Sequence, residues 1–375
     1  MSYIGWILFS FGLLRLGVSM VNLCSPLYLK KYGKLGRKST VSVLIPARNE
    51  EKSIRLLLED LLSSREPADE IIVYDDLSTD GTAGIVEEVS RLHPSVKLIR
   101  GTGPEKGWLG KNYACHQLAQ VARGDLFLFL DADVRTGKDL VGKSASYLER
   151  YRLSLLSIFP KQVMSSLGSR MTVPLMNWIL VSLLPLILVR KSKRISFSAA
   201  NGQFMLFRAP DYVTLLPHKR FRNNPVEDIA IIRFYKKQKL PVATLLGNQE
   251  IRCRMYDTAR EAVIGFSKNI FQFFGGSQFL TLLFAIATTI TPFYLFWFNS
   301  RNLGWLYVLI IIGIRIFTSC SSKQSWGQNV LLLLPQHLFF WVIIITGIRN
   351  RKKKRIVWKD RNIYAASSPE SSSSA

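Results

Sequence analysis

The apolar residues of this 375-residue chain follow two kinds of pattern. Long apolar blocks occupy residues 4–23, 172–189, 278–298, 303–319 and 329–348, and most are close to the length that a helix needs to cross a bilayer. From residue 41 to residue 130, short apolar runs instead alternate with stretches in which apolar residues recur every three or four positions. The pattern therefore predicts alternating buried strands and amphipathic helices, flanked by membrane segments.

The alternating region predicts a largely parallel sheet. Strands are expected at residues 41–45, 71–74, 96–99 and 127–130, with helices beginning near residue 54 and covering residues 82–92 and 112–122. Such alternation is typical of α/β domains with right-handed crossovers. The predicted fold class is a Rossmann-like α/β sheet flanked by helices, with transmembrane helices on its N-terminal and C-terminal sides.

Polar side chains follow three of these strands where each strand ends. Arg48 and Glu50 follow the first strand, Asp75 and Asp76 the second, and Asp131 and Asp133 the fourth. Carboxyl ends of parallel strands share one edge of the sheet, where ligands of such sheets bind. Two carboxylates spaced i, i+2 suit a divalent cation that takes its other ligands from water and a diphosphate. Helix capping would explain one such end, but three in register predict a nucleotide cleft.

The first apolar block is predicted to be a membrane anchor, within an N-terminal segment 1–28. It contains Arg15, which is costly in a bilayer unless it is paired or reaches the interface. A cleaved signal peptide would need a basic start and a small-residue cleavage site, and neither is present. The basic residues that follow place the next segment in the cytoplasm by the positive-inside rule. They are Lys30, Lys31, Lys34, Arg37 and Lys38.

Composition narrows the choice of partners. The formal net charge of +24 and a pI near 10.0 indicate an anionic partner, such as lipid, nucleic acid or a phosphorylated substrate. The hydrophobic content of 48% is gathered in long blocks, which favours membrane lipids and argues against nucleic acid. The four cysteines are scattered and show no metal-binding spacing, which fits a reduced, cytosol-facing protein.

Three motifs together resemble the family 2 glycosyltransferases with the GT-A fold. They are Ile45-Pro-Ala-Arg-Asn-Glu-Glu51, Asp75-Asp-Leu-Ser-Thr-Asp-Gly81 and Leu130-Asp-Ala-Asp133. Two further motifs, Gly107-Trp-Leu-Gly-Lys111 and Ala200-Asn-Gly-Gln-Phe-Met-Leu-Phe-Arg208, are similar to the membrane-anchored branch that glycosylates carotenoid acids (the diaponeurosporenoate type) and to hopanoid-associated transferases. The resemblance covers residues 41–269, and residues 358–364 are similar to the tail of the carotenoid type. Leu77 is a departure, because the family usually has glycine there.

The resemblance implies roles for individual residues. The nucleotide-sugar would be bound by Pro46, Arg48, Glu50, Asp76, Lys111 and Asp131, with Pro46 and Glu50 bordering the base and Asp76 hydrogen-bonded to it. Asp131 and Asp133 would hold Mg²⁺ or Mn²⁺ on the diphosphate. The family's catalytic base lies in an acidic pair, here Glu227 and Asp228, with Asp228 as the base.

Residues 223–228 also have a structural interpretation. An Asn cap, a proline at the first position and acids in the first turn are typical of a helix start, and a capping carboxylate can also be a base. Further phosphate or acceptor contacts are expected from Gln203, His218, Arg254 and Lys268. For the two basic residues the alternative is docking on the membrane surface.

The second half of the chain leaves two questions open. Residues 172–189 are interpreted as an interfacial helix pair on the bilayer, supported by the basic run 190–194, or as a buried hairpin. Three spans in the C-terminal region 278–348 would put the basic, Ser-rich tail 349–375 outside, against the positive-inside rule. Either one segment is re-entrant, with Pro335 and His337 making the last one suspect, or the rule fails here.

The expected protein is a multi-pass enzyme of the cell membrane, with a glycosyltransferase domain over residues 40–270 in the cytoplasm. Its expected activity is the inverting, metal-dependent transfer of a hexose, such as glucose from UDP-glucose, to a lipid-like acceptor such as a carotenoid acid. A polyprenyl-phosphate or other glycolipid glycosyltransferase is one alternative. A non-catalytic membrane scaffold is another, but it does not explain three aligned polar strand ends.

Overall fold

The computed structural model describes residues 2–30, 39–353, 357–358 and 361–362. The chain forms two compact units. The helical unit comprises residues 1–27, 161–191 and 254–353, and the sheet unit comprises residues 28–160, 192–253 and 354–375. The domain expected over 40–270 is thus interrupted by residues 161–191. Basic residues 31–38, and all of the tail beyond residue 353 except 357–358 and 361–362, lie outside the described residues.

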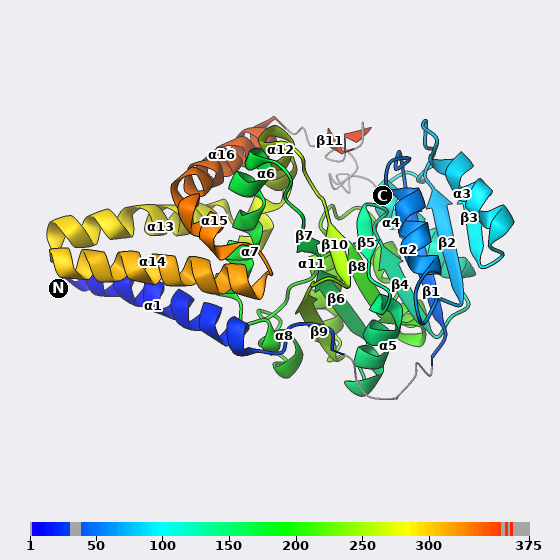
Figure 1. Ribbon diagram of the computed structural model, residues 1–375, viewed down its shortest axis with the longest axis horizontal. Helices are drawn as coiled ribbons and strands as arrows, with labels where there is room; N and C mark the ends of the chain where they lie inside the picture. Colours follow the sequence, from blue (N-terminus) through cyan, green and yellow to red (C-terminus); the bar gives the residue numbers. More distant parts are fainter. Residues whose placement is uncertain (1, 31–38, 354–356, 359–360, 363–375) are drawn as a thin grey trace, which may run out of the picture. The chain divides into compact units, whose positions relative to one another are not determined.

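The sheet unit is built on a seven-stranded mixed sheet with the order β3-β2-β1-β4-β8-β6-β9 (Figure 1). Its strands are β1 Val41–Ala47, β2 Glu70–Asp75, β3 Val96–Arg100, β4 Leu126–Leu130, β6 Leu155–Phe159, β8 Phe204–Arg208 and β9 Val242–Leu246. Strands β1 to β4 pair in parallel, β8 is antiparallel to β4 and β6, and β9 is parallel to β6. The predicted α/β fold class is confirmed, and the sheet is mixed because β8 reverses direction.

Helices cover the sheet because their apolar faces need burial. They are α2 Ile54–Leu62, α3 Thr82–Leu92, α4 Gly110–Val121, α5 Leu140–Arg150, α9 Ala209–Leu215, α10 Pro217–Arg220 and α11 Glu227–Lys237. In α2 the buried residues Ile54, Leu57, Leu58 and Leu61 follow the helical period. Short strands β5 Val134–Thr136 and β10 Ile251–Cys253 pair antiparallel, as do β11 Val357–Trp358 and β12 Arg361–Asn362.

An aromatic cluster fills the core where β4 meets β8. The ring of Phe129 lies 5.6 Å from that of Phe207, 5.4 Å from Tyr212 and 4.8 Å from His218. The Tyr212 hydroxyl is hydrogen-bonded to Nδ1 of His218 at 2.6 Å. This cluster packs against β4, the strand that Asp131 follows.

The helical unit contains α1 Tyr3–Cys24, α6 Leu167–Thr172, α7 Pro174–Leu183, α8 Ile187–Lys191, α12 Ala259–Asn269, α13 Gln278–Phe298, α14 Arg301–Ser321, α15 Trp326–Leu331 and α16 Leu333–Lys352, together with the 3₁₀ helix Ile270–Phe274 and the strand β7 Lys161–Gln162. Helices α1, α13 and α14 pack together (Figure 1) and are long and apolar enough to cross a membrane. They match three predicted spans.

The candidate span over residues 329–348 is divided between two helices, α15 and α16. The helical conformation is interrupted at Leu332, between α15 and α16. Among the described residues, neither of these two helices has the length and apolarity of a candidate span. Polar side chains explain this. Gln336 is fully buried and bonded to Arg315, and Asn329 is bonded to Ser319, so the segment packs through polar contacts inside the unit.

Residues 172–189 form α7 and α8, and α7 packs against α1 and α14. Its apolar side chains are largely covered: Leu175, Ile179 and Val181 are 0–1% exposed. The alternative of a buried hairpin therefore describes this segment better than an exposed interfacial pair.

The aromatic cluster generates a stability prediction. Phe129→Ala removes a ring that is only 3% exposed, and we expect a loss of about 3–5 kcal/mol, which lowers the thermal midpoint by at least about 6 °C. Leu92→Ala is the control, because Leu92 is 73% exposed. Differential scanning fluorimetry in detergent measures both, and equal midpoints would contradict this account of the core.

Candidate active site

Strand register brings the three polar strand ends together. Leu44 pairs with Phe129 and Ala47 pairs with Asp75, so the residues just beyond β1, β2 and β4 reach the same edge. Antiparallel β8 begins at this edge, because Phe204 pairs with Leu130. The amide of Asp131 donates to the carbonyl of Gln203 at 3.2 Å. The Asn-Gly-Gln motif thus lies beside the Asp-x-Asp motif.

The loops after β1 and β2 are bonded to each other. The amide of Thr79 donates to Asn49 Oδ1 at 2.8 Å, and the amide of Asn49 donates to Ser78 Oγ at 3.0 Å. Arg48 Nη1 donates to the carbonyl of Asp76 at 2.6 Å and to that of Leu77 at 3.2 Å. Leu77 has a φ of 55°, a left-handed conformation that suits glycine, which explains the family's usual residue there.

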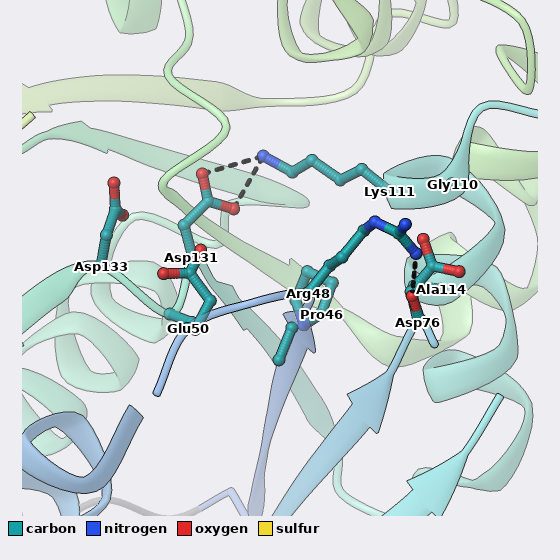
Figure 2. A pocket seen from close by; sticks show the side chains of 11 residues that line it. Pro46, Arg48, Glu50, Asp76, Gly110, Lys111, Ala114, Asp131 and Asp133 are labelled. Carbon is teal, nitrogen blue, oxygen red and sulfur yellow. Dashed lines mark hydrogen bonds and ion pairs between the residues drawn. The ribbon is translucent and has the colours of Figure 1, made fainter. Parts of the chain in front are cut away.

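A pocket opens at this edge (Figure 2). It is lined by Pro46, Ala47, Arg48, Glu50, Asp76, Gly110, Lys111, Ala114, Asp131, Ala132 and Asp133. All six residues predicted to bind the nucleotide-sugar line it, and so do both predicted metal ligands. Residues far apart in the sequence therefore meet as the strand-end argument requires.

Lys111 is the cation at the centre of the site. Its Nζ lies 2.7 Å from Asp131 Oδ1 and 3.5 Å from Glu227 Oε1, and it donates to the carbonyl of Gly202 at 3.3 Å. Burial lowers the pKa of Lys111, but the carboxylates of Asp131 and Glu227 outweigh this and raise the pKa above its ordinary value. The lysine is therefore charged and linked to both acidic motifs.

Asp133 carries charge that this lysine does not fully balance. Burial, then repulsion from Asp131 and Glu50, raise the pKa of Asp133 to about 6. Gln203 Nε2 donates to Asp133 Oδ1 over a long distance of 3.4 Å. Figure 2 shows the carboxylates of Asp131, Asp133 and Glu50 on one side of the pocket. Excess negative charge on hard oxygens suits a divalent cation.

The protein supplies few metal ligands here. Among the described residues no group of three His, Cys, Asp or Glu side chains is arranged to hold a metal ion. A pair of carboxylates is nevertheless what Mg²⁺ commonly uses when phosphates and waters complete its octahedron. The donor set of Asp131 and Asp133 thus fits a metal that arrives with a diphosphate.

Asp228 and Glu227 begin α11, whose N-cap is Val226 and not the predicted Asn. Pro225 precedes the cap, and Asn224 Oδ1 accepts from the amide of Val226. Asp228 Oδ2 accepts from the amide of Gly202 at 2.9 Å. Burial, then the Glu227 carboxylate, raise the pKa of Asp228 to about 7.

Three positioning residues were missed from the sequence. Asn112 Nδ2 contacts the carbonyls of Phe221, Arg222 and Asn224 at 2.9–3.2 Å, which holds the start of α4 to the segment leading into α11. Ser157 Oγ bonds both the amide and the carbonyl of Asn201, at 2.8 and 3.2 Å. A Cβ on Gly202 would lie 3.0 Å from Lys111 Nζ. Two signals in the sequence could have found them: Asn112 is adjacent to Lys111, and Gly202 lies in the Ala200–Arg208 motif.

The other candidate residues are distributed differently. Gln203 bonds Asp133 and, at 2.9 Å, Cys253 Sγ, so it supports the metal-binding motif. His218 is 2% exposed and belongs to the aromatic cluster, where burial lowers its pKa to about 3, so it lies in the core and not in the pocket. Arg254, which is bonded to Asp257, and Lys268 in α12 belong to the helical unit.

Comparison with known proteins finds a family domain and similar chains. Residues 42–212 match the Glycosyl transferase family 2 model. A 4,4'-diaponeurosporenoate glycosyltransferase of Staphylococcus haemolyticus is 30% identical over 251 residues, which span 65% of each chain. One from Staphylococcus aureus is 27% identical over 373 residues, 92% of this chain and 95% of the relative. The chain carries a glycosyl transferase family 2 domain, and the prediction of a glycosyltransferase is confirmed.

A solved structure supports the fold. The mannosyltransferase from Pyrobaculum calidifontis, in complex with GDP-Man and Mn²⁺, is similar with a TM-score of 0.59 at 14% identity, covering 92% of this chain and 96% of that chain. At this identity the likeness concerns the fold alone. The GT-A fold expected from the sequence is confirmed.

The charge of the pocket generates a binding prediction. Asp133→Ala leaves one carboxylate for the metal, and we expect Mn²⁺-dependent nucleotide-sugar binding to weaken about 10- to 100-fold. Isothermal titration with UDP- and GDP-sugars, with Mn²⁺ or with EDTA, measures this. Glu87→Ala is the control, because Glu87 pairs with Arg100 on the surface. Unchanged metal dependence in Asp133→Ala would contradict the assignment.

Proposed function

We propose that the sheet unit of this glycosyltransferase transfers a sugar, with inversion, from a nucleotide donor to a lipid-like acceptor that has a carboxylic acid head. The observation that carries the proposal is the pocket in which Asp76, Lys111, Asp131 and Asp133 meet. The names of the relatives support a carotenoid acid as the acceptor. UDP-glucose is the donor that we expect.

The positions of the pocket residues support different roles along the length of the bound nucleotide-sugar. Asp76 and Glu50 lie at the β1 and β2 ends and would border the nucleobase. Arg48, held on the carbonyls of Asp76 and Leu77, fixes that loop. Lys111 would exchange part of its ion pair with Asp131 for the diphosphate. Asp131 and Asp133 would hold Mg²⁺ or Mn²⁺, and the chemistry that such a cation would supply is neutralisation of charge on the diphosphate.

Asp228 is the proposed base. Its Oδ2 accepts from the amide of Gly202, whose carbonyl in turn accepts from Lys111 of the pocket, although Asp228 itself is not among the residues that line the pocket. A hydroxyl acceptor would lose its proton to Asp228 as its oxygen bonds the anomeric carbon and the carbon–diphosphate bond breaks. A carboxylic acid acceptor is already ionised near pH 7 and needs no such transfer.

The membrane topology that we propose has three crossings. Helices α13 and α14 form an antiparallel hairpin, and the amino end of α1 lies at its turn, because the Ser2 amide donates to Asn299 Oδ1 at 3.1 Å. Without a span over 329–348, the chain leaves α14 on the side where α1 ends. The sheet unit and the basic tail then share the cytoplasmic side, as the positive-inside rule requires.

Cysteine labelling tests the topology. In a variant lacking the four native cysteines, Asn302→Cys at the α13–α14 turn is expected to react with an impermeant maleimide added outside intact cells. Glu105→Cys in the sheet unit is expected to react only after lysis. The reverse pattern, or labelling of both from outside, would overturn the proposed orientation.

The acceptor and the base are tested together by pH profiles. The ionised Asp228 is the active form and its pKa is about 7, so transfer to a long-chain alcohol is expected to rise with pH through about 7. Asp228→Asn is expected to lower that rate about 10²- to 10⁴-fold. Transfer to a long-chain polyene acid in micelles is expected to depend less on pH and on Asp228.

The matched control is Asp211→Asn, since Asp211 also lies in the first turn of a helix. Transfer is followed by mass spectrometry of the glycosylated lipid, with circular dichroism to confirm folding. If the folded Asp228→Asn variant glycosylates the alcohol at the normal rate, the assignment of Asp228 as the base is contradicted. Efficient transfer to a small water-soluble alcohol, with none to lipid acceptors, would overturn the proposed acceptor class.

A further inference from the structure

Two arginines lie within the proposed membrane-crossing helices of the helical unit. Arg15 belongs to α1 and Arg315 to α14, and they are only 4% and 2% exposed. A cation within a transmembrane segment is costly, and such residues commonly mark substrate or ion sites. Neither arginine was assigned a role above.

Both guanidinium groups stand over the same indole ring. Cζ of Arg15 lies 4.7 Å from the Trp178 ring centroid and that of Arg315 lies 4.3 Å from it. Arg15 also donates to Ser182 Oγ through Nη2 at 2.8 Å, and Arg315 donates to Gln336 Oε1 through Nη1 at 2.9 Å. We call Arg15, Trp178 and Arg315 the arginine stack. Its hydrogen-bond partners are neutral.

The helical unit offers the arginine stack no negative charge. Its sequence contains only two acidic residues, Asp257 and Glu261. Asp257 is bonded to Arg254, and Glu261 closes the capping box at the start of α12. Moreover, Arg315 Nε is buried and has no hydrogen-bond partner within the described part of the chain. Two like charges and an unsatisfied donor therefore lack a counter-ion.

The arginine stack lies between one end and the middle of the proposed spans. Arg15 precedes Cys24 by nine residues and Arg315 precedes Ser321 by six. At 1.5 Å per residue these positions are about 14 Å and 9 Å from helix ends that the proposed topology puts on one side of the membrane. An anion carried on an apolar chain could therefore reach both guanidiniums with its tail still in lipid.

We infer that the arginine stack binds the anionic head group, a carboxylate or a phosphate, of a lipid. Guanidinium groups bind both anions through paired N–H donors, and burial strengthens such bonds. The stacking on Trp178 stabilises the cations before a ligand arrives, and within the described part of the chain Nε of Arg315 remains a donor without a partner. The inference rests on the proposed topology for its depth, and not on the donor site.

The test measures lipid binding to the full chain in neutral detergent. Oleate is the probe, oleyl alcohol is its uncharged counterpart, and acetate and inorganic phosphate are free anions without a chain. Microscale thermophoresis is expected to show saturable oleate binding, at least about ten-fold tighter than that of oleyl alcohol, with no competition by the free anions. If phosphatidylglycerol competes with oleate, the site binds bulk phospholipid. If phosphatidylglycerol does not compete, the site binds single-chain acids such as the proposed acceptor.

Variants locate the site. Arg315→Gln and Arg15→Gln are each expected to weaken oleate binding about ten-fold or more, and Arg315→Lys, which keeps the charge, to weaken it less. Arg301→Gln is the control, because Arg301 is exposed at the start of α14. Asp133→Ala is expected to keep oleate binding, which separates this site from the proposed donor site.

Equal binding of oleate by wild type, Arg15→Gln and Arg315→Gln would overturn the inference. Equal affinity of the wild type for oleate and oleyl alcohol would also overturn it. This second measurement needs no variant, so it decides the question even where an arginine substitution prevents folding.

Discussion

Four carboxylates converge at the edge of the sheet, and their mutual repulsion is the constraint that the site has to satisfy. Asp131 and Asp133 follow β4, whereas Glu227 and Asp228 begin α11. One ammonium group, Lys111 Nζ, contacts a carboxylate from each motif and the carbonyl of Gly202 between them. Because a single lysine cannot neutralise four acids, burial and repulsion raise the pKa of Asp133 to about 6 and that of Asp228 to about 7. The incomplete neutralisation would favour binding of a cation and would let the proposed base, Asp228, act near neutral pH.

Local pattern was sufficient to predict the strands and the polar strand ends, because a parallel sheet aligns the ends of its strands by register alone. The predicted strand at 127–130 and the helix at 82–92 match β4 and α3 almost residue for residue. The contacts that complete the site are not local. Lys111 contacts Glu227, and its neighbour Asn112 bonds carbonyls of the segment that leads into α11, a bond that no periodicity in the sequence predicts. The cap of α11 was predicted wrongly for the same reason, since Asn224 turns the chain before the helix begins.

In the helical unit, apolar length predicted three helices that are long and apolar enough to cross a membrane, and it did not predict the polar contacts of a fourth segment. Residues 329–348 resemble a span in composition, yet Asn329 and Gln336 are bonded to each other and to Ser319 and Arg315. A hydropathy average counts such groups as weakly polar and cannot register that they bind partners inside the protein. With the three crossings proposed above, the basic tail would lie on the cytoplasmic side, in agreement with the positive-inside rule.

The two units differ in the sign of their buried charge. The helical unit holds two of the chain's 26 acidic residues, and neither contacts the buried arginines, so the acids are concentrated in the sheet unit where solvent, lysine or a metal can balance them. Each unit thus contains buried charge of one sign in excess: carboxylates around Lys111 and guanidiniums around Trp178. Buried charge without a partner is expensive, and a fold keeps it where a ligand of opposite charge offsets the cost. A metal diphosphate would do so in the first case and a lipid anion in the second, which are the two kinds of substrate that a membrane glycosyltransferase brings together.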